Sequence, residues 1–157
     1  HQIVNLSQRG ISQYKIFEII TQNLNKLQSV DKTIIWYTNS DRIYVNENVE
    51  YPTRCKSTHR FADMVASDAL SNPDWNKIAK NYYKFFYNQN LQDFISECII
   101  NQVGNLLGDN IVECSGFKTD HKKIKSFFEL RKQCQGNINH FNDEGNKIIY
   151  EWIKSNL

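Results

Sequence analysis

Apolar residues recur at helical spacing along much of the chain. Four of them share the first stripe: Ile16, Ile20, Leu24 and Leu27. Ser12, just before this stripe, is a residue type that caps the N-terminus of a helix. We therefore expect a first helix from Ser12 to about Leu27. The same spacing predicts further helices near residues 57–69, 72–86, 90–107, 120–136 and 143–153.

Two neighbouring segments have the composition of strands. Residues 33–38 are mostly β-branched or aromatic, and residues 42–45 follow the turn-forming Asn39-Ser40-Asp41. This pattern predicts a β-hairpin, and a further short strand is expected at residues 111–117. Helices around a small antiparallel hairpin make an α+β fold. We expect a mostly helical single domain that spans residues 1–157, because a chain of this length usually forms one core.

The clearest helix start is Asn72-Pro73-Asp74, where asparagine caps, proline takes the first helical position and an acid follows in the first turn. On this helix the residues expected on the buried face are Trp75, Ile78, Ala79, Tyr82 and Phe86. On the next helix the expected stripe is Leu91, Phe94, Ile95, Cys98 and Ile99. We predict that Trp75 belongs to the core.

Composition excludes a membrane-spanning chain, and the charge leaves the partner open. The longest apolar run, residues 34–37, is far shorter than the roughly 18–20 residues that cross a bilayer. The net charge of +2 argues by itself neither for nor against nucleic acid, and neither half of the chain is a basic arm. We do not expect nucleic acid as a partner. One local excess of basic residues consists of Lys118, Lys122, Lys123, Lys125, Arg131 and Lys132, diluted by Asp120 and Glu129. A solvated helix face is its simplest interpretation.

The four cysteines are Cys55, Cys98, Cys114 and Cys134, and none stands in a CxxC pair. Zinc-ribbon and thioredoxin-type sites therefore have no support. Two structural disulfides in an exported protein and four buried thiols are both compatible with this spacing. Cys55 and His59 lack a second ligand pair, so we expect neither a metal nor another cofactor.

Two histidines offer the only candidate for acid–base chemistry. His121 stands beside two lysines, and His140 precedes Asp143 and Glu144. A small nuclease-type toxin could use two histidines and a lysine around one phosphate. The alternative is that both are surface residues at helix starts, and we assign no catalytic residue.

The stretch from Tyr82 to Tyr87 is unusually aromatic. Helical spacing places Tyr83 and Tyr87 one turn apart, on the flank that also carries Asn76 and Lys80. Tyrosines beside amide and ammonium donors can stack on sugar rings and bond their hydroxyl groups. These four residues are the predicted ligand contacts. A wide core face whose tyrosine hydroxyls reach water is the competing interpretation.

Several short motifs follow one another between residues 49 and 114. They are Tyr51-Pro52, Cys55, Asp63-Met64-Val65, Asn81-Tyr82-Tyr83-Lys84 and Glu113-Cys114. In this order they resemble the β subunits of virus-encoded killer toxins of yeast. The resemblance covers under half of the chain, and residues 115–157 have no counterpart in it.

The resemblance implies secretion, proteolytic maturation, disulfides, a second toxin subunit, binding to cell-wall β-1,6-glucan and lethal ion leakage at the target membrane. It also implies a Cys55–Cys114 disulfide, which leaves Cys98 and Cys134 as the other pair. One departure is that residues 59–62 replace a further cysteine of the family.

Three functions follow as hypotheses. The first is a secreted, non-enzymatic, killer-toxin-like domain that recognises a fungal cell surface, as part of a toxin that kills competing yeast by membrane permeabilisation. The second is a nuclease-type toxin that uses His121 and His140. The third is an intracellular interaction module with four thiols.

Overall fold

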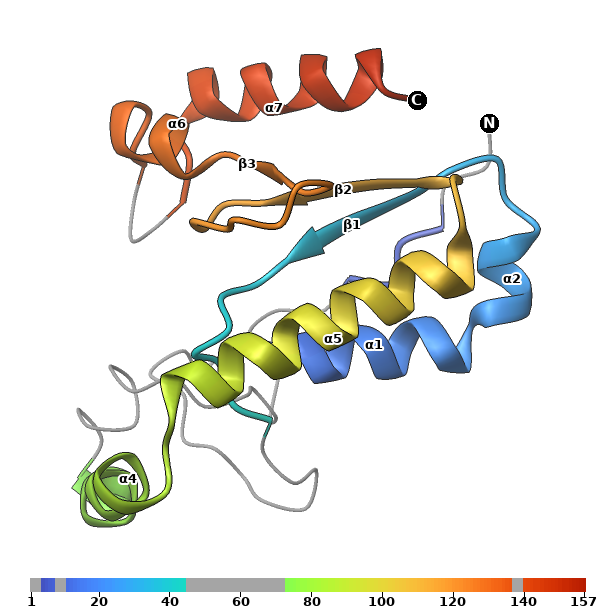
Figure 1. Cartoon of the computed structure of the whole chain (residues 1–157). Coiled ribbons are helices and arrows are strands. Elements are labelled where there is room, and N and C mark those ends of the chain that lie inside the picture. Colours follow the sequence, from blue (N-terminus) through green and yellow to red (C-terminus); the bar gives the residue numbers. More distant parts are fainter. Residues whose placement is uncertain (1–3, 8–10, 45–72, 137–139) are drawn as a thin grey trace. The chain divides into compact units, whose positions relative to one another are not determined.

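The structure, a computed structural model, describes residues 4–7, 11–44, 73–136 and 140–157, and the backbone alone of residues 73–75 (Figure 1). More than half of these residues are helical. The chain divides into two compact units. Unit 1 consists of His1–Gln22 and Asn39–Asn101, and unit 2 of Asn23–Thr38 and Gln102–Leu157. That residues 1–157 form a single domain stays a prediction.

The helices of unit 1 are α1 (Gln13–Gln22), α4 (Pro73–Phe85) and the first part of α5 (Gln89–Leu107). Ser12 caps α1 as predicted, because its Oγ accepts the backbone N–H of Lys15 at 3.2 Å. At α5 the cap is Asn88 rather than Asn90, and its Oδ1 accepts the N–H of Leu91 at 3.1 Å. The predicted helix at 57–69 and the side chain of Trp75 lie outside the described residues.

Unit 2 contains the sheet. Its elements are α2 (Leu24–Gln28), β1 (Thr33–Tyr37), β2 (Ile111–Ser115), β3 (Lys125–Ser126), α6 (Phe128–Gln133) and α7 (Asp143–Ser155), with the end of α5. The strand order is β1-β2-β3, and both pairings are parallel. Between α5 and β2, Gly108 turns the chain with φ +63°, a backbone conformation that glycine adopts readily. The fold is thus helical with a small sheet, as expected.

The predicted antiparallel hairpin is wrong. Asn39 does begin a turn, because its carbonyl oxygen accepts the N–H of Arg42 at 3.2 Å, but residues 42–44 do not return as a strand beside β1. Instead β1 pairs with β2, from Thr33 opposite Ile111 to Tyr37 opposite Ser115. Residues 112–115 of β2 are all buried, which is typical of the central strand of a parallel sheet.

The predicted helix at 120–136 is also largely wrong, since only α6 forms within it. Residues 116–124 are a loop, and two hydroxyl side chains bond to its backbone. Thr119 Oγ1 accepts the N–H of His121, and Ser126 Oγ donates to the carbonyl oxygen of Phe117. Such bonds give the backbone an alternative to the helix, which explains why the helical spacing misled.

Helix α7 covers one face of the sheet (Figure 1). The core beneath it contains Cys114, Phe127 and Ile149, with Leu130, Phe141, Trp152 and Ile153 packed against them. The ring of Phe127 lies parallel to Trp36 at 5.9 Å between centroids and edge-on to Trp152 at 5.4 Å. Aromatic pairs of this kind add to the free energy of burial.

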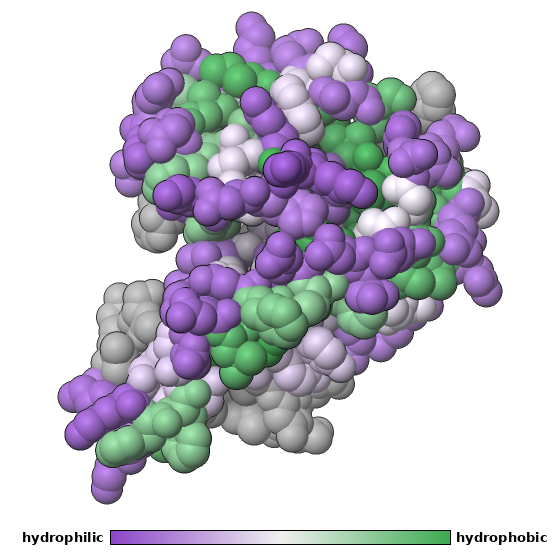
Figure 2. Space-filling model, viewed as in Figure 1, coloured by the Kyte–Doolittle hydropathy of each residue, from purple (hydrophilic) through white to green (hydrophobic). Residues whose placement is uncertain are grey.

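The expected buried faces of α4 and α5 are only partly confirmed. Ala79 and Ile99 are buried, but Ile78 is 61% exposed, Phe86 75% and Phe94 63%. Figure 2 shows hydrophobic surface over α4 and over the first part of α5. Apolar spacing therefore located these helices correctly without identifying the side that packs.

Candidate functional site

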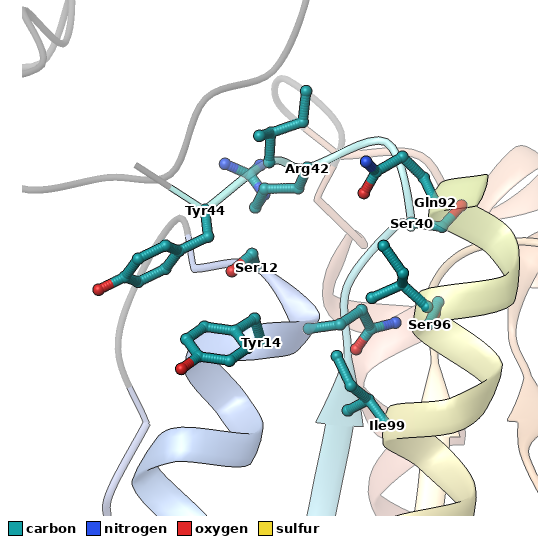
Figure 3. A pocket seen from close by; sticks show the side chains of 11 residues that line it. Ser12, Tyr14, Ser40, Arg42, Tyr44, Gln92, Ser96 and Ile99 are labelled. Carbon is teal, nitrogen blue, oxygen red and sulfur yellow. The ribbon is translucent and has the colours of Figure 1, made fainter. Parts of the chain in front are cut away.

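A pocket of about 210 Å³ lies in unit 1, where the start of α1, residues 40–44 and the middle of α5 meet (Figure 3). Pockets for drug-sized ligands are typically larger, at about 300–1,000 Å³. The pocket therefore has room for one ring-sized ligand. Its lining consists of Ser12, Gln13, Tyr14, Ser40, Arg42, Ile43, Tyr44, Gln92, Ile95, Ser96 and Ile99.

Two polar side chains of α5 face the pocket from the same side of the helix. Ser96 is only 8% exposed, and Gln92, one turn earlier, is half-buried. Neither side chain makes a hydrogen bond within the part of the chain that the structure describes. Both residues line the pocket, so their unbonded polar groups are available to a ligand that enters it. Together they offer a hydroxyl group, an amide N–H and an amide oxygen.

Two tyrosines form an aromatic wall. The rings of Tyr14, at the start of α1, and Tyr44 lie 4.9 Å apart between centroids, with their planes at 67° (Figure 3). This edge-to-face arrangement is a favourable one for aromatic pairs and fixes both rings. Tyr14 is exposed, so part of its ring can contact a ligand.

Behind the pocket, a chain of hydrogen bonds holds Ser40. The Ser40 hydroxyl donates to Asp93 Oδ1, and Gln89 Nε2 donates to both Ser40 Oγ, at 3.2 Å, and Asp93 Oδ1, at 2.8 Å. Gln89 Oε1 in turn accepts the hydroxyl of Tyr87. Tyr87, one of the predicted contacts, is therefore linked to the pocket wall through Gln89.

Two titratable groups beside this network, Asp41 and Tyr87, have a raised pKa. Burial raises the pKa of Asp41, and Asp93 raises it further, while Arg42 acts in the opposite direction. Burial also raises the pKa of Tyr87, and the carboxylates of Asp41 and Asp93 add to the effect. Tyr87 consequently remains a hydrogen-bond donor throughout the neutral range.

The structure brings two of the four predicted contacts together. Tyr83 on α4 and Tyr87 after it lie 5.0 Å apart between ring centroids, and both are half-buried. Lys80 is exposed and Asn76 is half-buried on the same helix. Their role as sugar contacts stays a prediction.

Sequence reasoning missed the residues that line the pocket. They come from three segments that are far apart in the sequence, so no spacing connects them. One signal was present: Gln92 and Ser96 fall at helical spacing with the buried Ile99 and Val103. Polar residues at buried positions of a helix point to a site or to a hydrogen-bond partner.

The predicted disulfide between Cys98 and Cys134 is not formed. Cys98 is an exposed free thiol on α5, whereas Cys114 and Cys134 are buried free thiols in unit 2. Cys114 Sγ lies 3.6 Å from the carbonyl oxygen of Ile35, within the apolar core beneath α7. The Cys55–Cys114 pairing has no counterpart here either, because Cys114 is free and Cys55 lies outside the described residues.

The histidines occupy separate segments. His121 is half-buried in the loop 116–124, and His140 is exposed before α7. Across the described ranges, no group of three or more His, Cys, Asp or Glu side chains could hold a metal ion. No helix within these ranges is long and apolar enough to cross a membrane. No protein-family model, curated protein or solved structure matches the chain.

Proposed function

We propose that this chain is a non-enzymatic recognition domain of a secreted, killer-toxin-like protein, and that its pocket in unit 1 binds cell-wall glucan at a fungal surface. In this proposal the domain directs a toxin that kills competing yeast by membrane permeabilisation. The observation that carries the proposal is the pocket itself, with an aromatic wall opposite two polar side chains that have no hydrogen-bond partner among the described residues.

A pyranose ring fits this combination of side chains. Its C–H groups can lie against the Tyr14 ring, while its hydroxyl groups need donors and acceptors nearby. Gln92 and Ser96 supply both kinds of group. The volume of about 210 Å³ favours one sugar unit over a longer stretch of polymer.

The lining favours binding over catalysis. Glycoside hydrolysis needs two carboxyl groups at the scissile bond, and none of the lining residues carries one. Arg42 keeps its proton in proteins, so it cannot act as a general base. Asp41 and Asp93 lie beside the pocket, where Asp93 accepts two hydrogen bonds that hold Ser40 and Gln89 in place.

The four residues predicted from the sequence as ligand contacts are also part of this proposal. Tyr87 positions Ser40 through Gln89, and so acts on the pocket wall rather than as a stacking ring. Tyr83, Asn76 and the exposed Lys80 are proposed as contacts for further units of the polysaccharide.

Binding of the purified chain to pustulan, a β-1,6-glucan, with amylose as the control polymer, tests the proposal. We expect Tyr14→Ala and Ser96→Ala each to weaken binding at least about tenfold, which corresponds to about 1.4 kcal/mol of lost contact. The matched control is Tyr150→Ala, which removes an exposed tyrosine of α7 in unit 2 and should leave binding unchanged.

Several outcomes would contradict the proposal. If the intact chain does not bind pustulan, the glucan proposal fails. If Tyr83→Ala abolishes binding while Tyr14→Ala has no effect, the site lies on α4 instead of in the pocket. Degradation of tRNA that is lost in His121→Ala would favour the nuclease-type toxin.

A further inference from the structure

Six basic residues of unit 2 lie close together in the sequence, in the loop 116–124, in β3 and in α6. We call them the basic surface, and they are Lys118, Lys122, Lys123, Lys125, Arg131 and Lys132. Only two acids stand among them, Asp120 and Glu129. The sequence alone suggested a solvated helix face, but most of these residues lie on a loop and a short strand instead.

Arg131 is held in place by two aromatic rings. Its guanidinium lies 4.8 Å from the centroid of Phe117 and 5.8 Å from that of Phe128. A guanidinium in a cation–π contact can still donate its N–H groups to an anion. The side chain makes no hydrogen bond or ion pair with any residue that the structure describes. Arg131 is therefore a preorganised donor, which reduces the entropy that binding an anion costs.

The lysines around it are mostly unpaired. Lys132 Nζ lies 2.9 Å from Glu129 Oε1 and 4.3 Å from the centre of the Phe128 ring. Four others are exposed and form no ion pair with a described residue: Lys118, Lys122, Lys123 and Lys125. Like charges gathered on one surface repel each other, and a bound polyanion would relieve that repulsion.

We propose that the basic surface binds an anionic polysaccharide that carries sulfate or phosphate esters. Arginine can bond such a group through two N–H groups at once, and the lysines add charge along the chain. This surface belongs to unit 2 and the glucan pocket to unit 1, so the two proposals stand on different residues.

Two other polyanions fit less well. Single-stranded nucleic acid is bound largely by stacking bases on open aromatic rings, but both rings here already hold cations. Membrane surfaces are bound by exposed apolar side chains next to basic ones, but in this surface Phe117 and Phe128 are half-buried and Ile124 is buried.

The experiment measures binding of the full chain to dextran sulfate, with uncharged dextran of the same length as the control polymer. We expect binding to dextran sulfate and not to dextran. The logarithm of the binding constant should fall linearly with the logarithm of the salt concentration. The Lys122→Glu/Lys123→Glu variant should lose at least about tenfold in affinity, whereas Lys154→Glu, a change in the last turn of α7, should lose less than about threefold.

Arg131→Lys separates binding from a structural role. It keeps the charge but not the planar guanidinium, so affinity should fall while the thermal midpoint of unfolding stays unchanged. The proposal is overturned if dextran sulfate does not bind, or if Lys154→Glu weakens binding as much as the double variant. It is also overturned if a polyuridine of equal charge, or vesicles with anionic lipid, bind more tightly than dextran sulfate at the same salt concentration.

Discussion

The two units of this chain use their aromatic and apolar residues differently. In unit 2, Phe127 and Trp152 pack together beneath α7, and Phe127 is almost completely buried. In unit 1, Phe85, Phe86 and Phe94 are largely exposed, and buried polar side chains line a pocket. The difference suggests that the aromatic core of unit 2 contributes more to stability than the exposed aromatic residues of unit 1 do, and the proposed glucan pocket lies in unit 1.

The cysteines give the largest contrast between the units. Burial raises the pKa of Cys114 to about 12, so only about one thiol in ten thousand is ionised at pH 8. Cys98 in unit 1 is exposed. We expect iodoacetamide at pH 8 to modify Cys98 in the native protein, while Cys114 reacts only after denaturation. Peptide mass mapping measures both, and equal reaction of the two thiols in the native protein would contradict the burial of Cys114.

Removing one phenylalanine from each unit tests the same contrast in stability. Phe127→Ala should lower the free energy of unfolding by about 3–5 kcal/mol, because a large buried ring leaves a cavity. The matched variant Phe94→Ala, in unit 1, should change it by less than about 0.5 kcal/mol. Urea unfolding measures both values, and similar losses in the two variants would break the comparison.

Tyr37 offers a smaller effect in unit 2. Its hydroxyl donates to Glu113 Oε1 at 2.8 Å, and both residues are buried. Tyr37→Phe should cost about 1–3 kcal/mol, because the Glu113 carboxyl loses a hydrogen bond in a buried site. Burial foremost, and then the Glu113 charge, raise the pKa of Tyr37.

The sign of the pH dependence follows from that shift. Between the ordinary tyrosine pKa, near 10, and the higher folded value, the unfolded chain loses the Tyr37 proton while the folded chain keeps it. The stability that this proton provides is therefore complete below pH 10 and declines above it. Above pH 10, the free energy of unfolding of the parent protein should fall more steeply with pH than that of Tyr37→Phe. Equal slopes for the two proteins would contradict the role given to the Tyr37 proton.

The smallest expected effect is in unit 1. The raised pKa of Asp41 means that its ionised form is disfavoured in the folded state. Stability that protonation provides is present below the ordinary aspartate pKa and lost as the pH rises through the folded value. Asp41→Asn should thus raise the thermal midpoint at pH 7 by no more than about 2 °C, since the group is partly exposed. The gain should vanish below pH 4, and a gain that persists there would exclude ionisation as its cause.

Features set by residues close together in the sequence could be predicted better than features set by residues far apart. Local signals located two helix starts to within one residue: Ser12 caps α1, and Asn142, one residue before the expected Asp143, caps α7 by accepting the N–H of Gly145 at 2.9 Å. Residues 33–37 form a strand as expected. These features depend on neighbours within a few residues, which a sequence displays directly.

Long-range pairing could not be predicted in the same way. The partner of Thr33 is Ile111, and nothing in the sequence near Thr33 indicates it, whereas the turn at Asn39 resembled the start of a hairpin. The pocket could not be predicted from the sequence for the same reason, because Tyr14, Tyr44 and Ser96 come together only in the folded chain. Tyr87 was selected for its ring, but the structure uses its hydroxyl group.

Nuclear magnetic resonance titration of the isotope-labelled chain with gentiobiose, a β-1,6-linked glucose disaccharide, tests the central claim most directly. The claim is that the pocket of unit 1 receives the sugar. We predict saturable shifts of backbone amide resonances at residues 12–14, 40–44 and 92–99, none in α7, and none with the α-1,4-linked disaccharide maltose. Shifts confined to α4 or to unit 2, or no shifts up to saturating gentiobiose, would contradict the claim.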